Sequence, residues 1–203
     1  MLSSLCAILE PPAPAIRTRP AREYFIPSER DAIPVITMRG RTLTIRSVTP
    51  SDAPLLADML ARLSLRSTQL RFFRPLTSTE ALWREAARVA GGDPRQRVAL
   101  VATAVEDGTE RVTALAELAH NYGEPVVAEF AIVVRDDYQQ EGLGSMLAQL
   151  LVQVALLQGV GTLRAEMLAE NRAIRKLVHG LGLPYTAETH WGETTALLTL
   201  PQG

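Results

Sequence analysis

One carboxylate and one glycine pair stand out as residues that could do chemistry. Glu129 is the sole charged residue in the apolar run VVAEFAIVV, residues 126–134. Gly142 and Gly144 follow in QQEGLGS, residues 139–145, just before a long apolar segment. Period-two alternation places Glu129 on one face of a strand, and burial disfavours the charged form of a carboxyl group. We therefore expect Glu129 to be able to accept a proton.

The glycine pair predicts an anion site at the start of a helix. The first backbone N–H groups of a helix lack internal partners, and the helix dipole adds positive potential there. Glycine lets a phosphate approach the backbone closely, so a diphosphate is a natural ligand. The lysine of a P-loop is missing, and Leu147 stands where a dinucleotide fingerprint needs its third glycine. The alternative is that Gly142 and Gly144 only form a tight turn.

The surrounding segments alternate between strand and helix patterns. Expected strands are 41–48, 97–107, 111–121, 126–134, 162–169 and 193–200, and expected helices are 49–63, 78–90, 143–158 and 171–182. An extra short strand is expected near PYTAETHW, residues 184–191. The order β-α-α-β-β-β-α-β-α-β predicts an α/β (mixed α+β) fold with a central mixed, mostly antiparallel sheet of six to seven strands and helices on both faces.

Composition sets limits on the class of protein. The chain has 203 residues and a formal net charge of -1, which predicts no broad nucleic-acid footprint. No stretch approaches the roughly 18 apolar residues of a membrane helix. Cys6 is the single cysteine, so no intrachain disulfide can form, and a reducing, cytoplasmic location is expected. Three scattered histidines and one cysteine predict no metal site.

Proline marks the N-terminal segment as different from the rest. Six of the 13 prolines lie in residues 1–34. Such a segment cannot run as a regular helix or a central strand. We therefore expect a proline-rich N-terminal extension over residues 1–34 and one folded domain over 35–203.

The glycine motif and its context resemble a known family. Gln-x-x-Gly-x-Gly after an apolar strand, residues 139–144, resembles the acetyl-CoA pyrophosphate loop of the GNAT N-acetyltransferase superfamily. AEMLAENRAIRKLVHGLGL, residues 165–183, is similar to that family's fifth strand and following helix, with Asn171 at the place of a frequent asparagine. The resemblance covers roughly residues 41–200. It implies a GNAT fold, with acetyl-CoA as donor and no metal.

The resemblance also implies which residues bind acetyl-CoA. In the family, the strand before the glycine loop supplies a backbone N–H group to the acetyl oxygen, and the loop cradles the pyrophosphate. The implied residues are Ile132, Val133 and Val134 of the strand, Gln139, Gln140, Glu141, Gly142, Leu143, Gly144 and Ser145 of the loop, and Asn171.

A narrower resemblance concerns the acceptor. LRFFRPL (70–76), AEFAIVVRDDYQQEGLGS (128–145) and LAENRAIRKLVHGLG (168–182) look like bacterial protein-lysine acetyltransferases that modify acyl-CoA synthetases. This implies a primary amine as acceptor, such as a lysine of an acyl-CoA synthetase, and makes Glu129 the general base. Leu177 occupies the region where many GNAT enzymes carry a tyrosine acid, so the thiolate is expected to leave directly or to take a proton from water.

Several alternatives remain open at this stage. Glu166, and Glu117 with His120, are other candidates for the base, and Arg71 is a candidate substrate contact. The acceptor could instead be a small amine, such as a polyamine or an antibiotic. A third reading is an acyl-CoA sensor that does not turn over. The sequence is compatible with a homodimer but does not determine the oligomeric state.

Overall fold

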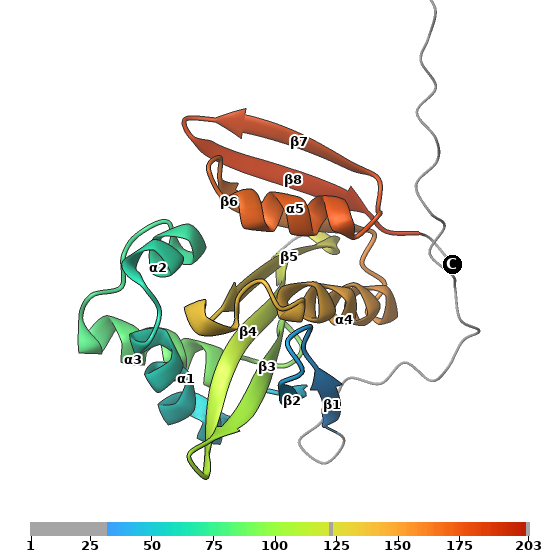
Figure 1. The fold of residues 1–203 in the computed structure, drawn as a ribbon. Helices are drawn as coiled ribbons and strands as arrows, with labels where there is room; N and C mark the ends of the chain where they lie inside the picture. The colour runs from blue at the N-terminus through green and yellow to red at the C-terminus, as the bar shows by residue number, and fades with distance from the viewer. Residues whose placement is uncertain (1–31, 122–123, 202–203) are drawn as a thin grey trace, which may run out of the picture.

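The computed structural model of the chain describes residues 32–121 and 124–201 (Figure 1). Most of the expected extension, residues 1–34, lies outside the described residues. Its last residues do not, because Ile33 and Pro34 already belong to the first strand. The fold therefore begins slightly before residue 35.

A single eight-stranded sheet forms the centre of the molecule, in the order β1-β2-β3-β4-β5-β6-β8-β7. The strands are β1 (Ile33–Ile36), β2 (Thr42–Ser47), β3 (Arg97–Glu106), β4 (Thr109–Asn121), β5 (Glu124–Val134), β6 (Thr162–Leu168), β7 (Tyr185–His190) and β8 (Glu193–Thr199). Among these described strands, only β5 and β6 pair in parallel. The predicted fold class is confirmed, with one strand more than the upper expected number. The unexpected strand is β1, whose Pro34 suits an edge position because proline cannot donate a ladder hydrogen bond.

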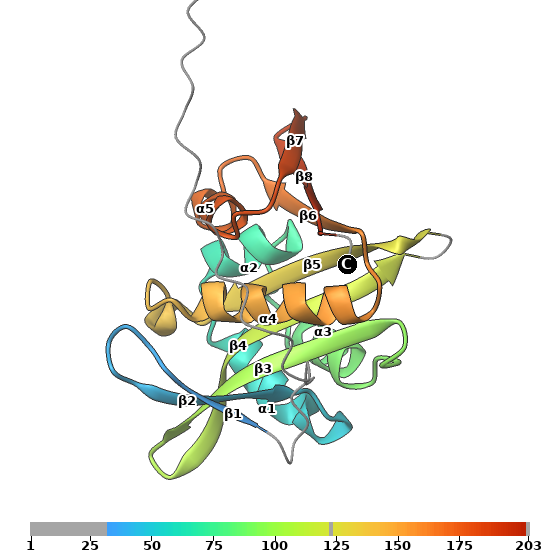
Figure 2. The ribbon, with the colours of Figure 1, turned by 90° about the vertical axis from the view of Figure 1, so that its right-hand side faces the viewer.

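Helices cover both faces of the sheet (Figures 1 and 2). They are α1 (Ala53–Ala61), α2 (Leu65–Phe72), α3 (Thr79–Ala90), α4 (Leu143–Leu157) and α5 (Arg172–Gly180). The short helix α2 was not expected, since its sequence LRSTQLRF is mostly polar. Its start is nevertheless encoded locally, because the Ser64 side chain caps it by accepting a hydrogen bond from the Ser67 N–H group at 3.1 Å.

The core consists of two layers, one on each side of the sheet. On one side α4 packs on β3, β4 and β5, and its leucines Leu143, Leu147 and Leu151 are fully buried. On the other side α1 and α3 pack on the same strands, around Leu115 and Val133. Because β5 is covered on both faces, its sequence reads as an almost continuous apolar run instead of alternating.

The sheet opens between β5 and β6. The two strands pair only from Val127 to Glu129 on β5 and from Thr162 to Arg164 on β6. Beyond these pairs β5 continues along β4, while β6 continues along β8. Figure 2 shows the two strands diverging from their common end. We call this opening the fork; its edges are residues 130–134 of β5 and 165–168 of β6.

Candidate active site

Backbone register shows which groups of β5 face the fork. The Arg135 N–H group donates to the Thr113 carbonyl at 2.8 Å, so residue 135 faces β4. The Val126 carbonyl accepts from the Gly161 N–H group at 2.9 Å, so residue 126 faces the opposite side. Alternate residues of an antiparallel strand point to the same neighbour, and the β4–β5 register is unbroken from Ala128 to Val134. Even-numbered residues of this stretch therefore direct their N–H and carbonyl groups toward the fork.

The three strand residues expected to donate an N–H group differ in the direction of that group. Ile132 and Val134 direct their N–H groups into the fork, where no β6 residue pairs with them. Val133 does not, because its N–H group faces β4 and its side chain is buried among α1 and α3. We therefore correct the expected set, removing Val133 and keeping Ile132 and Val134 as available donors.

The glycine loop, residues 139–145, forms a concave run of backbone at the start of α4. Gln140 and Gly142 both adopt left-handed conformations, with φ of 60° and 84°. Gly142 is the N-cap of α4 and offers no side-chain cap to the first N–H groups. Alternating handedness and uncapped N–H groups make a backbone nest that suits a phosphate. The loop residues thus fit the pyrophosphate of acetyl-CoA.

The backbone of Gly142 requires glycine, whereas a Cβ on Gly144 would make ordinary van der Waals contacts. Gly142 needs its positive φ, and a Cβ there would lie 3.3 Å from the Met38 sulfur. A Cβ on Gly144 would lie 3.4 Å from Leu177 of α5 and 3.8 Å from Val134. The two glycines therefore lie in a tight turn, and this turn places the loop next to the end of β5.

Glu141 braces the loop from behind. Its carboxylate is fully buried and accepts a hydrogen bond from Arg41 Nε at 3.0 Å, with a second bond from Arg41 Nη2. Arg39 adds a weaker ion pair at 3.7 Å. The Arg41 hydrogen bond holds the pKa of Glu141 below its usual range. The Glu141 side chain is therefore a structural anchor, which leaves its backbone free to belong to the nest.

Two further expected contacts are engaged within the protein. Gln139 Nε2 donates to the Val134 carbonyl at 3.0 Å and to Ser67 Oγ at 3.2 Å. Asn171 is the N-cap of α5, and its Oδ1 accepts from the Ile174 N–H group at 3.2 Å. These side chains fix the loop and α5. Gln140 and Ser145 remain exposed at the loop surface.

Glu129 stands at the base of the fork. It lies opposite Ala119 of β4 and beside Arg164 of β6, in the last pair before the strands part. It was expected to be buried but is only partly so, whereas its neighbours Ala128 and Phe130 are buried on the α4 face. Among the residues that the structure describes, the Glu129 side chain makes no hydrogen bond or ion pair. Its carboxylate is therefore available to a ligand.

Glu117 has an environment that argues against a role as base. It is 3% exposed and forms ion pairs with Arg71 at 2.6 Å, Arg88 at 3.0 Å and Arg97 at 2.8 Å. We call these four residues the arginine cluster. Burial alone would raise the Glu117 pKa, but the three guanidinium groups outweigh it and the pKa is lowered. A carboxylate stabilised in this way is a weak proton acceptor.

The other candidates differ from Glu129 in position: His120 lies on the α4 face of the sheet, and Glu166 lies on the β6 edge of the fork. His120 pairs with Ala128 on the α4 face, and its Nε2 is 2.9 Å from Gln158 Oε1. Glu166 is exposed on β6, opposite Thr195 of β8. Neither shares the position of Glu129 at the last β5–β6 pair.

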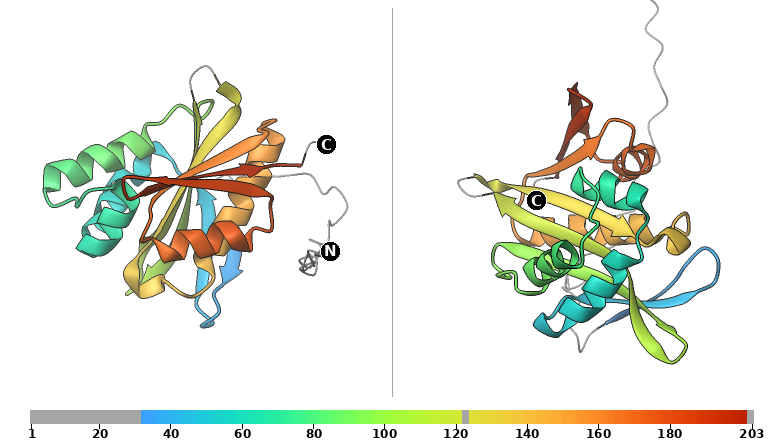
Figure 3. Two further views of the ribbon diagram at one scale, coloured as in Figure 1. Left: turned by 90° about the horizontal axis from the view of Figure 1, so that it is seen from above. Right: turned by 90° about the vertical axis from the view of Figure 1, so that its left-hand side faces the viewer.

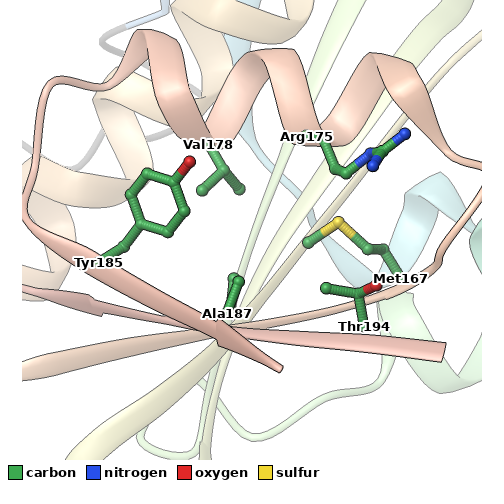
Figure 4. Close-up of a pocket in the computed structure, with 7 residues that line it drawn as sticks. Met167, Arg175, Val178, Tyr185, Ala187 and Thr194 are labelled. Atoms are coloured by element: carbon green, nitrogen blue, oxygen red, sulfur yellow. The ribbon is translucent and has the colours of Figure 1, made fainter. Parts of the chain in front are cut away.

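A small cavity lies elsewhere, under α5 (Figure 4). It has a volume of about 80 Å³ and is lined by Met167, Arg175, Val178, Tyr185, Ala187, Thr194 and Ala196. Ligand pockets commonly measure about 300–1,000 Å³. The cavity is too small for an acetyl donor and its acceptor, and we assign it no role.

The described residues contain neither a group of metal ligands nor a membrane-spanning helix. No group of three or more His, Cys, Asp or Glu within residues 32–121 and 124–201 could hold a metal ion. Within the same ranges, no helix is long and apolar enough to cross a membrane.

Comparison with known proteins identifies the family. The model of the acetyltransferase (GNAT) domain matches residues 42–184, so the chain belongs to the GNAT acetyltransferase family. Members use acetyl-CoA as the acetyl donor. The predicted family, enzyme class and donor are therefore confirmed.

Two curated relatives are acetyltransferases. The chain is 30% identical over 156 residues to Acetyltransferase Pat of Mycolicibacterium smegmatis, covering 77% of this chain and 45% of Pat. It is 31% identical over 144 residues to Acetyltransferase PA5475 of Pseudomonas aeruginosa, covering 70% of this chain and 75% of that protein. The chain thus aligns with less than half the length of Pat.

Solved structures share the fold. The GNAT domain of S. lividans PAT superposes with a TM-score of 0.71 at 24% identity, covering 83% of this chain and 97% of that one. YncA, a putative acetyltransferase from Salmonella typhimurium solved with its cofactor acetyl-CoA, gives a TM-score of 0.56 at 22% identity, covering 79% and 95%. Both comparisons support the fold alone.

Proposed function

We propose that this acetyltransferase transfers the acetyl group of acetyl-CoA to a lysine amine of a protein, with Glu129 as general base. The observation that carries the proposal is the position of Glu129 at the last β5–β6 pair, partly exposed and without a described partner. The likeness of this chain to Acetyltransferase Pat, over 45% of the length of Pat, supports a protein acceptor.

The residues would act in a defined order. Bound acetyl-CoA would supply an acetyl group activated as a thioester. The backbone N–H groups of residues 140–145 would hold its pyrophosphate, and those of Ile132 and Val134 would donate to the acetyl oxygen. Glu129 would accept the proton that the ammonium group of the lysine must lose before its nitrogen can attack. Leu177 offers no proton to the departing sulfur, which would leave as thiolate or be protonated by water.

The donor part of this proposal is tested by binding. Acetyl-CoA should raise the melting temperature of the protein, and the stabilisation should grow with the logarithm of its concentration relative to Kd. Coenzyme A alone should also bind, since the pyrophosphate nest does not contact the acetyl group. Absence of any shift with either compound would refute the assignment of the loop.

The acceptor part is tested by release of free thiol from acetyl-CoA. The panel comprises a purified acyl-CoA synthetase, poly-L-lysine, spermidine and an aminoglycoside, each with the wild-type protein and with Glu129→Gln. Turnover with the two lysine acceptors, and loss of it in the variant, would support the proposal. Turnover with spermidine or the aminoglycoside alone would replace the protein acceptor by a small amine, and binding without turnover would indicate a sensor.

A further inference from the structure

We infer that Arg71 and Glu117 are positioning residues that fix helix α2 as the wall of the acceptor side of the site. The inference rests on the proposed function only in that it takes the Glu129 face as the side where the amine enters. It assigns to Arg71 a role different from the direct substrate contact that its sequence suggested.

Helix α2 lies across the fork. It contacts both β5 and β6, the two strands that part there. In the right-hand view of Figure 3, α2 crosses in front of β5 and reaches the side of β6. Phe72, in its last turn, packs against the α1–α3 side of the core. Helix α2 therefore covers the fork from the face on which Glu129 stands.

Polar contacts hold the first turn of α2. Asp136 accepts hydrogen bonds from the Ser64 N–H group at 2.9 Å, from Ser64 Oγ at 2.7 Å and from Ser67 Oγ at 2.8 Å. Ser67 also accepts the hydrogen bond from Gln139 of the glycine loop. The start of α2 is thus tied to the segment that leads from β5 into the donor site.

Apolar packing of α2 on the core comes mainly from Phe72. The buried residues of the helix are Ser67 and Thr68, both polar. The helix ends at Phe73, which has a left-handed φ of 60° and is 38% exposed. That conformation is unfavourable for an aromatic residue and persists only where its surroundings impose it. The position of the last turn must therefore come from specific side-chain contacts.

Arg71 supplies the contact at the last turn. Its Nη2 donates to Glu117 Oε2 at 2.6 Å, and its guanidinium lies 4.9 Å from the Phe72 ring. Glu117 is held in turn by Arg88 of α3 and Arg97 of β3. The anchor therefore belongs to the layer formed by the sheet and α3, and the Arg71 guanidinium adds a polar link from α2 to this layer beside the packing of Phe72.

The anchor lies close to the proposed base. Glu117 is opposite Ala131, and Glu129 is opposite Ala119, so the two carboxylates occupy diagonal positions on the same face of β4 and β5. Cα atoms in such diagonal positions are roughly 7–8 Å apart. An amine that approaches Glu129 on this face passes beside α2, and a shift of α2 alters its path.

The test compares two arginines of the same cluster. Arg71→Met removes the contact between Glu117 and α2, whereas Arg88→Met removes the contact between Glu117 and α3. With poly-L-lysine as the acceptor probe, Arg71→Met should raise the acceptor KM by about tenfold or more, because small displacements at a site are costly, while the Kd for acetyl-CoA stays unchanged. Arg88→Met should lower the melting temperature and change that KM far less than Arg71→Met does, because Arg97 still holds Glu117 and Arg71 still joins it to α2. Arg71→Lys, which keeps one charged donor, should recover part of the loss.

Hydrogen exchange gives a readout that does not need turnover. In Arg71→Met, amides of residues 64–73 should exchange faster than in the wild type, while those of β4 and β5 should not. Equal changes in KM and exchange for Arg71→Met and Arg88→Met, or unchanged exchange of residues 64–73, would overturn the inference. If the wild type released no thiol with any amine, the proposed acceptor would fail, and the exchange measurement would still decide the position of α2.

Discussion

The proposed donor side and the proposed acceptor side of the fork are built in different ways. The donor side consists of backbone: the nest of residues 139–145 and the N–H groups of Ile132 and Val134. Its brace is the partly buried ion pair of Arg41 with Glu141 behind the loop. The acceptor side consists of side chains: Glu129 on the sheet and a polar helix, α2, held by hydrogen bonds and by the arginine cluster. A binding site formed by backbone groups depends little on the side chains of its residues. A site formed by side chains is altered when one of those side chains is replaced.

The largest effect should come from removing the anion at the centre of the arginine cluster. Glu117→Ala leaves three guanidinium groups close together without their buried partner. Loss of one member of a buried ionic network typically costs about 3–5 kcal/mol. Chemical denaturation should show this loss, and hydrogen exchange should place it first in α2 and α3. Stability equal to that of the wild type would mean that the cluster does not hold the acceptor side.

A smaller effect, confined to the donor side, should follow from Gly142→Ala. The backbone at Gly142 has a φ of 84°, and a Cβ in that conformation costs roughly 1–2 kcal/mol. The strain and the contact with Met38 should distort the nest, so the Kd for acetyl-CoA should rise by about tenfold or more.

Gly108→Ala is the matched control for this comparison. Gly108 has a φ of 75° and lies in the turn between β3 and β4, with open space around it. The control should lose similar stability and keep the wild-type Kd in a calorimetric titration. Equal Kd values for both variants would contradict the nest.

Lowering the pH should destabilise the donor side and the acceptor side to a similar extent. Near neutral pH this is the smallest of the predicted effects. The pKa of Glu117 on the acceptor side and of Glu141 on the donor side are both lowered by arginine partners. A carboxylate whose pKa is lowered by folding stabilises the folded state above its unfolded pKa, about 4.3 for glutamate. That contribution is lost as the pH falls from there through the folded pKa. Thermal unfolding between pH 7 and pH 3 should show a stable plateau and then a decline, and a decline that began above pH 6 would contradict these assignments.

The contrast between the two sides also explains what the sequence could predict. The nest depends on local order, since the strand, glycine turn and helix follow one another in the chain. Glu129 was recognisable as the one charged residue in the apolar run 126–134. The contacts of the acceptor side join distant segments, as Arg71 and Glu117 are 46 residues apart, and no local pattern encodes such a pair. Helix α2 was missed because it is polar and eight residues long.

One correction and one addition follow the same physical division. Val133 was expected from its place in the motif, but its N–H group points away from the fork. Glu141 was expected to act through its backbone, and its side chain has a separate role as an anchor. Val133 faces β4 by strand parity, and the Glu141 side chain turns inward to Arg41. Motif spacing predicts where backbone lies, whereas the side on which each group points depends on the register and on the neighbours that the fold supplies.

The proposed general base can be tested by one rate comparison. Thiol release from saturating acetyl-CoA, with poly-L-lysine as acceptor, is measured for the wild type, Glu129→Gln and Glu166→Gln, after calorimetry has shown equal acetyl-CoA binding. General-base catalysis contributes typically 10²–10⁴-fold, so Glu129→Gln should lose roughly that factor in kcat while Glu166→Gln stays within about twofold of the wild type. A rate for Glu129→Gln equal to that of the wild type would contradict the role of Glu129 as base.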